Sequence, residues 1–165
     1  MNKTAEKTAV SAVFAALTFV FTLISFPVGA GGYVNLGDAI VLICAYACGG
    51  LYGALCAPFG AAIADVVLGF AVYAPATFVV KLTVAAVSYC AVCKKYRGSY
   101  AGRALRFAAC ELIMVAGYFV YDYFVLGYGI GAVYNSIFNL MQGAICAAVS
   151  SFIVRVIGKY GKMFR

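Results

Sequence analysis

A few charged and polar side chains lie inside long apolar stretches of this sequence. Asp65 and Lys81 flank one short loop between two such stretches, so they would lie at similar depth and could form an ion pair. Tyr118 and Asp122 are four residues apart and therefore share one face of a helix. An ionisable group within an apolar helix is by default a candidate for a functional site, because its burial is costly.

Amide side chains form a second polar face further along the chain. Asn135, Asn139 and Gln142 follow the spacing i, i+4 and i+7, which places them on one side of a helix. Counted from the expected helix ends, they fall at the same depth as the residues above. Polar groups from several helices at one level predict a ligand-binding pocket. The candidate ligand-binding residues are Asp65, Lys81, Tyr118, Asp122, Asn135, Asn139 and Gln142.

Structural roles remain open for part of this set. The Asp65–Lys81 pair could equally have a purely structural role and fix the packing of two helices. Asn139 and Gln142 would also suit hydrogen bonds between helices, which contribute about 0.6–2 kcal/mol each in membranes.

Two further carboxyl groups have local interpretations. Asp38 is interpreted as a cap of the helix that it opens. Glu111 is interpreted as a local partner of Arg106, nearer the other end of its helix.

Catalytic chemistry has almost no candidates in this sequence. The chain has no histidine and five carboxyl side chains, so general acid–base catalysis lacks its usual groups. The phosphate-binding loop G-x-x-x-x-G-K-[ST] and the hydrolase motifs H-E-x-x-H and G-x-S-x-G are missing. The seven cysteines fall in or beside apolar stretches, and we interpret them, including Cys90 and Cys93, as small buried side chains. We therefore expect neither an enzyme nor a metal or cofactor.

Composition places the chain in a lipid bilayer. Of its 165 residues, 66% are hydrophobic and 10% are charged, and the mean hydropathy is +1.02. A soluble chain of this length could not bury so much apolar surface in one core. The net charge of +7 does not indicate nucleic-acid binding, because no polar domain carries it.

Six apolar stretches, each read as a transmembrane helix, make one all-α integral membrane domain over residues 1–165. The expected helices are Thr8–Phe26, Asn35 or Asp38–Cys48, Leu51–Gly69, Pro75–Cys93, Ala104–Leu126 and Gly131–Ile157. The boundary at Gly49-Gly50 is either a tight turn between two helices or a kink in one long segment.

Charge asymmetry supports the count of six. Eleven of the twelve basic residues fall in three clusters: before the first helix, between the fourth and fifth, and after the sixth. The expected outer loops (27–37, 70–75 and 127–131) contain no Lys or Arg. Since cytoplasmic loops collect these residues, six helices place both termini in the cytoplasm. Four helices would also satisfy this parity. We interpret the first apolar run as a retained helix rather than a signal peptide, because it is too long.

Aromatic and small residues add two patterns. Six tyrosines near the expected outer boundary are interpreted mainly as an interfacial belt, although one or two would also suit a flat heterocyclic ligand. They are Tyr33, Tyr73, Tyr121, Tyr123, Tyr128 and Tyr134. A stripe of small residues on the first helix suits close approach of another helix, internal or from another protein. Its members are Ala5, Ala9, Ala12 and Ala16. A similar row, Gly53, Ala57 and Ala61, is read as internal packing.

Several short motifs, in this order, resemble a known transporter family. They are Gly37-Asp38-Ala39-Ile40, Gly49-Gly50-Leu51-Tyr52-Gly53, Ala64-Asp65 with Gly69, the run Tyr73–Lys81, and Asn139-Leu140-Met141-Gln142-Gly143. The chain resembles the substrate-binding S components of energy-coupling factor (ECF) vitamin transporters over nearly its whole length. It looks closest to the riboflavin, hydroxymethylpyrimidine and pyridoxine types.

The resemblance implies a function and partners. An S component binds a vitamin or precursor near the outer face of a prokaryotic plasma membrane and then joins a transmembrane coupling subunit and two ATPases. The family docks through an Ala-x-x-x-Ala motif in helix 1, which Ala12 and Ala16 match, with Ala5 to Ala9 as a second possibility. A small aromatic heterocycle is the expected cargo. A stand-alone channel or secondary transporter, and a purely structural membrane subunit, are the rival interpretations.

Overall fold

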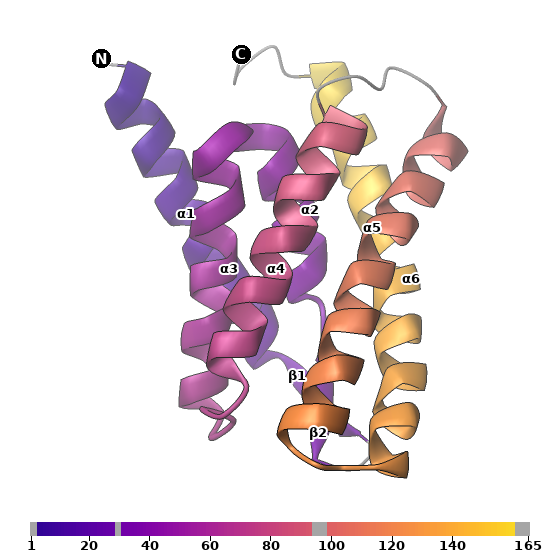
Figure 1. Cartoon of the computed structure of the whole chain (residues 1–165). Coiled ribbons are helices and arrows are strands. Elements are labelled where there is room, and N and C mark those ends of the chain that lie inside the picture. Colours follow the sequence, from indigo (N-terminus) through magenta and orange to yellow (C-terminus); the bar gives the residue numbers. More distant parts are fainter. Residues whose placement is uncertain (1–2, 29–30, 94–98, 161–165) are drawn as a thin grey trace.

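A computed structural model describes residues 3–28, 31–93 and 99–160, and this part of the chain forms a bundle of six α-helices (Figure 1). A two-stranded hairpin joins the first two helices, and π-helical turns at Tyr89–Cys93 and Tyr121–Val125 extend α4 and α5. The helices are α1 Lys3–Leu23, α2 Gly37–Cys48, α3 Gly50–Val67, α4 Ala74–Ser88, α5 Tyr100–Val120 and α6 Ile130–Tyr160.

Four helical segments in the described residues are long and apolar enough to cross a membrane. They are Ala5–Leu23, Ala74–Ala91, Tyr100–Val125 and Ile130–Ile157. Two further apolar helices, Gly37–Cys48 and Tyr52–Val67, are shorter. Six helices were expected, and the structure has six, but two of them fall below the usual spanning length.

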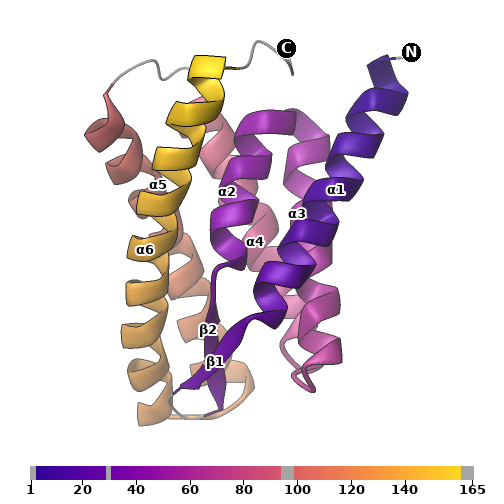
Figure 2. The ribbon, with the colours of Figure 1, turned by 180° about the vertical axis from the view of Figure 1, so that it is seen from behind.

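The short helix α2 lies at the centre of the bundle. Every residue from Gly37 to Ala45 is buried, and the helix contacts α1, α3, α4 and α6. Twelve residues make a helix of about 18 Å, well short of a hydrocarbon core of about 30 Å. The β-hairpin occupies the remaining depth below α2 (Figure 2). Because other helices surround α2, it can be apolar on all sides without facing lipid.

The hairpin corrects the all-α prediction and the expected end of the first helix. That helix ends at Leu23 instead of Phe26, and β1 (Ser25–Val28) pairs antiparallel with β2 (Gly32–Asn35). Pro27 explains the change, because proline disfavours a helical conformation for the residue before it and tolerates an edge strand. The expected outer loop 27–37 therefore contains ordered strand pairing; Gly29 lies outside the described residues.

A tight turn, rather than a kink, separates α2 from α3. Gly49 has φ of +61°, a conformation that residues with a Cβ rarely adopt. A Cβ at this position would also lie 2.8 Å from Cε2 of Tyr89. The two helices therefore reverse direction at this glycine and pack on each other.

Close approach between α1 and α3 depends on a second glycine. A Cβ on Gly60 would lie 2.1 Å from the carbonyl oxygen of Ala15. Gly53 has the same role toward α2, since a Cβ there would lie 2.9 Å from the carbonyl oxygen of Cys44. The row Gly53, Ala57 and Ala61 is buried, which confirms its interpretation as internal packing.

Helix α1 turns polar residues inward and apolar residues outward. Ser11, Thr18 and Thr22 are buried, whereas Val13 and Val20 are exposed. This is the reverse of a soluble helix and is typical of helices packed in lipid, where small hydroxyl residues mediate helix contacts. The stripe Ala5, Ala9, Ala12 and Ala16 is exposed. It is therefore not used for packing within the described part of the chain.

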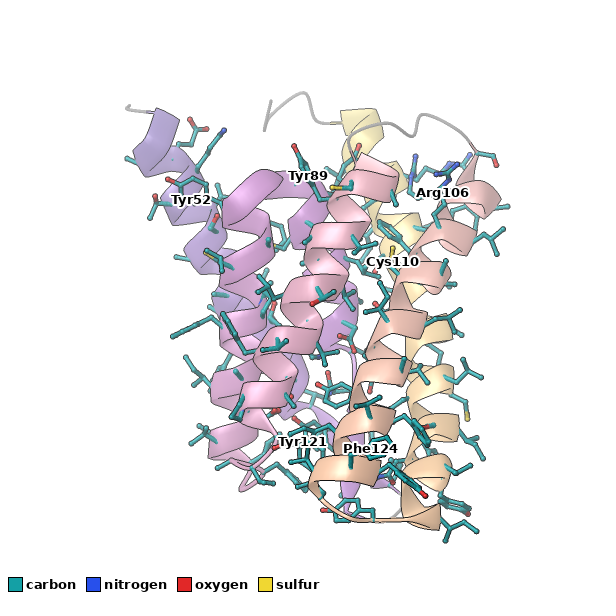
Figure 3. The ribbon with its side chains drawn as sticks, in the orientation of Figure 1. Tyr52, Tyr89, Arg106, Cys110, Tyr121 and Phe124 are labelled. Carbon is teal, nitrogen blue, oxygen red and sulfur yellow. The ribbon has the colours of Figure 1, made fainter. Side chains whose placement is uncertain are left out.

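The start of α1, the end of α6 and the facing ends of α4 and α5 all lie at one end of the bundle (Figure 1). Helix α5 begins at Tyr100, four residues earlier than expected, because Ser99 caps it by accepting a hydrogen bond from the Gly102 amide at 3.2 Å. Arg106 lies near this end, and Tyr121 and Phe124 lie at the opposite end, with the hairpin (Figure 3). Of the basic clusters, Lys94, Lys95, Arg97, Lys162 and Arg165 lie outside the described residues.

Candidate ligand-binding site

A cavity lies between the hairpin and helices α3 to α6. All seven predicted binding residues line it, so the structure brings the whole set together. Residues from the hairpin and from α4 complete the wall, and the sequence patterns did not single them out as ligand-binding. The added residues are Val28, Gly32, Tyr33, Asn35, Tyr73 and Thr77. From the sequence, Tyr33 and Tyr73 were assigned mainly to the interfacial belt. Tyrosines of the belt and tyrosines of a pocket lie at the same depth, so depth alone could not tell the two apart.

The predicted Asp65–Lys81 ion pair is wrong. Lys81 instead pairs with Asp38, whose Oδ1 lies 3.0 Å from Nζ, and both side chains are almost completely buried (2% and 0% exposed). Asp38 is consequently not a helix cap, and α2 has no side-chain cap hydrogen bond. Its position in the first turn of α2 still favours a negative charge, since the helix dipole is positive there.

Gln142 connects this ion pair to the hairpin. Its Nε2 donates to Oδ2 of Asp38, and its Oε1 accepts the backbone N–H of Asn35 at 2.7 Å. The side-chain oxygen of Asn35 in turn accepts the N–H of Gly37 at 2.7 Å. The structural alternative therefore holds for Gln142, which joins α6, α2 and β2.

Asp122 is the centre of a second network. Its Oδ1 accepts from the Tyr73 hydroxyl at 2.8 Å, and its Oδ2 accepts from Nδ2 of Asn135 at 2.9 Å. These contacts join the loop before α4 to α5 and α6. Beside this network, the hydroxyl groups of Thr77 and Tyr118 share a hydrogen bond of 2.8 Å across α4 and α5.

Asp65 lies on the α3 side of the cavity. The Tyr33 hydroxyl donates a hydrogen bond to its Oδ1. Burial, and next the charge of Asp65, raise the pKa of Tyr33, so this hydroxyl stays protonated and keeps donating. The Tyr33 ring packs against Phe70 with centroids 4.9 Å apart.

Asn139 differs from its neighbours on α6. It lines the cavity and is partly exposed, and among the described residues its side chain has no hydrogen-bond partner. The alternative of a hydrogen bond between helices therefore fails for Asn139 while it holds for Gln142. Asn139 presents both a donor and an acceptor to the cavity.

The cavity is polar in its wall and small in its volume, about 40 Å³. A water molecule needs roughly 10–15 Å³ of such space, so the cavity has room for only a few waters. A heterocyclic ligand therefore requires the hairpin or the wall side chains to move apart. In the described part of the chain, no three histidine, cysteine or acidic side chains are grouped so that they could hold an ion.

Glu111 lies outside this cavity wall, and its interpretation as a partner of Arg106 is wrong. The carboxyl group is buried, and neither oxygen has a hydrogen-bond partner among the described residues. Arg106 donates instead to the carbonyl oxygen of Ala91 at 3.2 Å. Glu111 packs against Gly143: a Cβ added to Gly143 would lie 2.8 Å from the Cβ of Glu111.

Comparison with known proteins identifies the kind of site. The family described as the ECF-type riboflavin transporter, S component, matches residues 2–161. The chain belongs to this family. It is also 31% identical over 144 residues to a Pyrococcus woesei protein described as an uncharacterized protein in a gap 3′ region, covering 85% of this chain and 95% of that one.

Membership in the ECF S-component family settles several expectations. The chain is a membrane protein of vitamin transport and a substrate-binding subunit, so the prediction that it is not an enzyme is confirmed. The resemblance drawn from the ordered motifs is confirmed as well. The cavity described above is the natural candidate for the site that binds the transported compound.

Proposed function

We propose that this ECF S component is a high-affinity, membrane-embedded binding subunit for a vitamin or vitamin precursor, energised by separate ATPases. The single observation that carries the proposal is the cavity, because polar residues from the hairpin and four helices meet there in an otherwise apolar bundle. Polar and ionisable side chains inside a membrane bundle are costly to bury, and where several meet they usually mark a functional site.

A small aromatic heterocycle suits this cavity. Tyr33, Tyr73 and Tyr118 offer ring faces for stacking, and Asn139 offers an amide for an orienting hydrogen bond. In this proposal Asp65, Lys81, Tyr118, Asp122, Asn135, Asn139 and Gln142 form the ligand site, directly or by holding their neighbours in place.

We place six transmembrane helices in the plasma membrane of a prokaryote, with both termini in the cytoplasm. The described members of the basic clusters, among them Lys7, Arg103, Arg106 and Arg155, belong to the helix ends at the end of the bundle where α1 begins and α6 ends. The hairpin and the cavity then face the outside, from which the cargo arrives.

Partner docking is assigned to the alanine stripe of α1. Ala9, Ala12 and Ala16 are exposed and lie on one face of that helix. Small side chains allow a helix of the transmembrane coupling subunit to approach closely. The coupling subunit would bring the two ATPases that supply energy.

The first experiment is mass spectrometry of small molecules released when the detergent-purified protein is denatured. A vitamin or precursor in stoichiometric amount would support the proposal and name the cargo. An empty protein that also shows no thermal shift with a panel of B vitamins would contradict it. Uptake in cells that lack the ATPases would instead favour a stand-alone transporter.

A further inference from the structure

Carboxylates outnumber cations around the cavity. Among the described residues that line it, Asp65 and Asp122 are acidic and Lys81 is the one basic side chain; Asp38 does not line the cavity but pairs with Lys81. The ion pair neutralises Asp38, and Asp122 receives two hydrogen bonds. Of these three carboxylates, Asp65 is the one with an oxygen that has neither a hydrogen bond nor an ion pair among the described residues.

One oxygen of Asp65 has no hydrogen-bond partner. Oδ1 accepts from Tyr33, whereas Oδ2 accepts no hydrogen bond from the described residues, although the residue is 1% exposed. The Thr77 hydroxyl lies close enough to Asp65 to interact with it and also shares a hydrogen bond of 2.8 Å with Tyr118. A buried acceptor of this kind is costly to leave empty, so Oδ2 is open to a donor from the cavity, either water or a ligand.

A chain of aromatic rings runs from Tyr33, which donates to Asp65, through Phe70 and Tyr73 to Tyr118. Tyr33 and Phe70 lie 4.9 Å apart between centroids, Phe70 and Tyr73 lie 6.4 Å apart, and Tyr73 and Tyr118 lie 6.3 Å apart. The faces of such rings attract cations. Aromatic rings near a carboxylate oxygen that accepts no hydrogen bond favour a positive charge and disfavour an anion.

We propose that the site selects a ligand that carries a positive charge on or beside its aromatic ring, and that Asp65 receives this charge. The inference rests on the proposed function, because it names the chemical class of the cargo. Lys81 does not oppose a cationic ligand, since Asp38 already compensates its charge.

A charge series on one ring tests the inference with the purified full-length chain in detergent. The probes are pyridoxamine, which bears an ammonium group, pyridoxine, which has a hydroxyl group there, and 4-pyridoxic acid, which has a carboxylate. Thiamine and riboflavin extend the comparison to a permanent cation and a neutral flavin. We expect the cationic probe to bind about tenfold or more tightly than its neutral partner, and the anion to bind weakest.

Two matched variants locate the charge. Asp65→Asn keeps the shape and the acceptor for Tyr33, so it should abolish most of the preference for the cation, measured as the ratio of pyridoxamine affinity to pyridoxine affinity in each variant. Glu111→Gln removes a buried carboxyl group that does not line the cavity, and it should leave the preference intact.

The outcomes separate this inference from the proposed function. Tighter binding of a neutral or anionic probe, or an unchanged preference in Asp65→Asn, would overturn the assignment of a cationic cargo. The small molecule that co-purifies gives a second readout, because a neutral or anionic compound would overturn the assignment and a cation would support it. If no probe binds and nothing co-purifies, the proposed function fails, and this inference fails with it.

Discussion

At the scale of single residues, the polar side chains of the cavity differ in whether the protein itself satisfies them. Asp38, Lys81 and Gln142 have partners within the bundle, and Asp122 holds Tyr73. Substitution of these residues should affect folding as well as binding. Asn139 and the free oxygen of Asp65 point to contacts that a ligand would supply, because the described residues leave them open.

Asn139 and Gln142 make a matched pair for testing this distinction. Asn139→Ala should weaken ligand binding about tenfold while the melting temperature stays within a few degrees, since no protein hydrogen bond is lost. Gln142→Ala should also lower stability by about 1–3 kcal/mol, because Asp38 and the Asn35 amide lose a partner. Thermal unfolding and binding titrations in detergent measure both effects. Equal stability losses in the two variants would contradict the assignment of a structural role to Gln142 and a ligand-binding role to Asn139.

The buried ion pair predicts a strong non-additive effect. Lys81→Met leaves the Asp38 carboxylate buried without its cation, which should cost about 3–5 kcal/mol of stability. The double variant Lys81→Met with Asp38→Asn removes both charges and should recover most of that loss. Melting temperatures of the two single variants and the double variant give the coupling. Simple addition of the single effects would show that the pair contributes little.

At the scale of elements, the β-hairpin fills the depth of the bundle that the short helix α2 does not reach. It also forms part of the cavity wall. It is tied to α6 through Asn35 and Gln142 and to α3 through Tyr33 and Asp65. The cavity of about 40 Å³ is too small for a heterocycle, so this hairpin is the element most suited to move.

Hydrogen exchange should therefore change at the hairpin when ligand binds. The amides of β2, from Gly32 to Asn35, should exchange more slowly in the ligand-bound protein, because the open form becomes less populated. Exchange in α2, buried in both states, serves as the internal control. Equal protection of β2 with and without ligand would place the entrance elsewhere, and mass spectrometry of digested peptides makes the measurement.

The contact between α1 and α3 permits a sharper test of packing. Gly60→Ala introduces a Cβ that would lie 2.1 Å from the Ala15 carbonyl oxygen, so the helices must separate. We expect a loss of about 1–3 kcal/mol, measured as a lower melting temperature. Val67→Ala, on the exposed face of the same helix, is the control and should have little effect. A tolerated Gly60→Ala would mean that the helices are more loosely packed.

At the scale of the whole molecule, basic residues and exposed small residues are unevenly distributed over the bundle. The described basic residues other than Lys81 belong to the end of the bundle opposite the cavity, which allows the cavity to face outward while the basic end faces the cytoplasm. The α1 stripe is exposed along one side, where a partner helix can reach it.

Docking through α1 predicts a separation of binding from assembly. Ala12→Leu with Ala16→Leu should prevent co-purification with the coupling subunit and ATPases, because bulk blocks close helix approach, while ligand affinity stays unchanged. The same change at the exposed Ala86 and Ala109 on α4 and α5 is the control and should leave the complex intact. Normal assembly of the α1 variant would remove the stripe from the interface.

The sequence by itself determined the membrane class, the six helices and the sets of polar residues that share a helix face. Hydropathy depends on local composition, and the i, i+4 and i+7 spacing decides which residues share a helix face. For that reason the spacing within each helix, together with the depth counted from the helix ends, correctly groups Asn135, Asn139 and Gln142 with Tyr118 and Asp122, all of which line the cavity.

Only the tertiary structure decided which of these groups touch. Asp65 was the carboxylate expected nearest to Lys81, because the two residues flank one short loop between two helices. The central position of α2 instead brings Asp38 to Lys81. Tyr33 and Tyr73 reach the cavity because the β-hairpin and the loop before α4 fold under the bundle, which no helical periodicity encodes. Spacing fixes a face of one helix, whereas the partner of that face depends on how all the helices pack together.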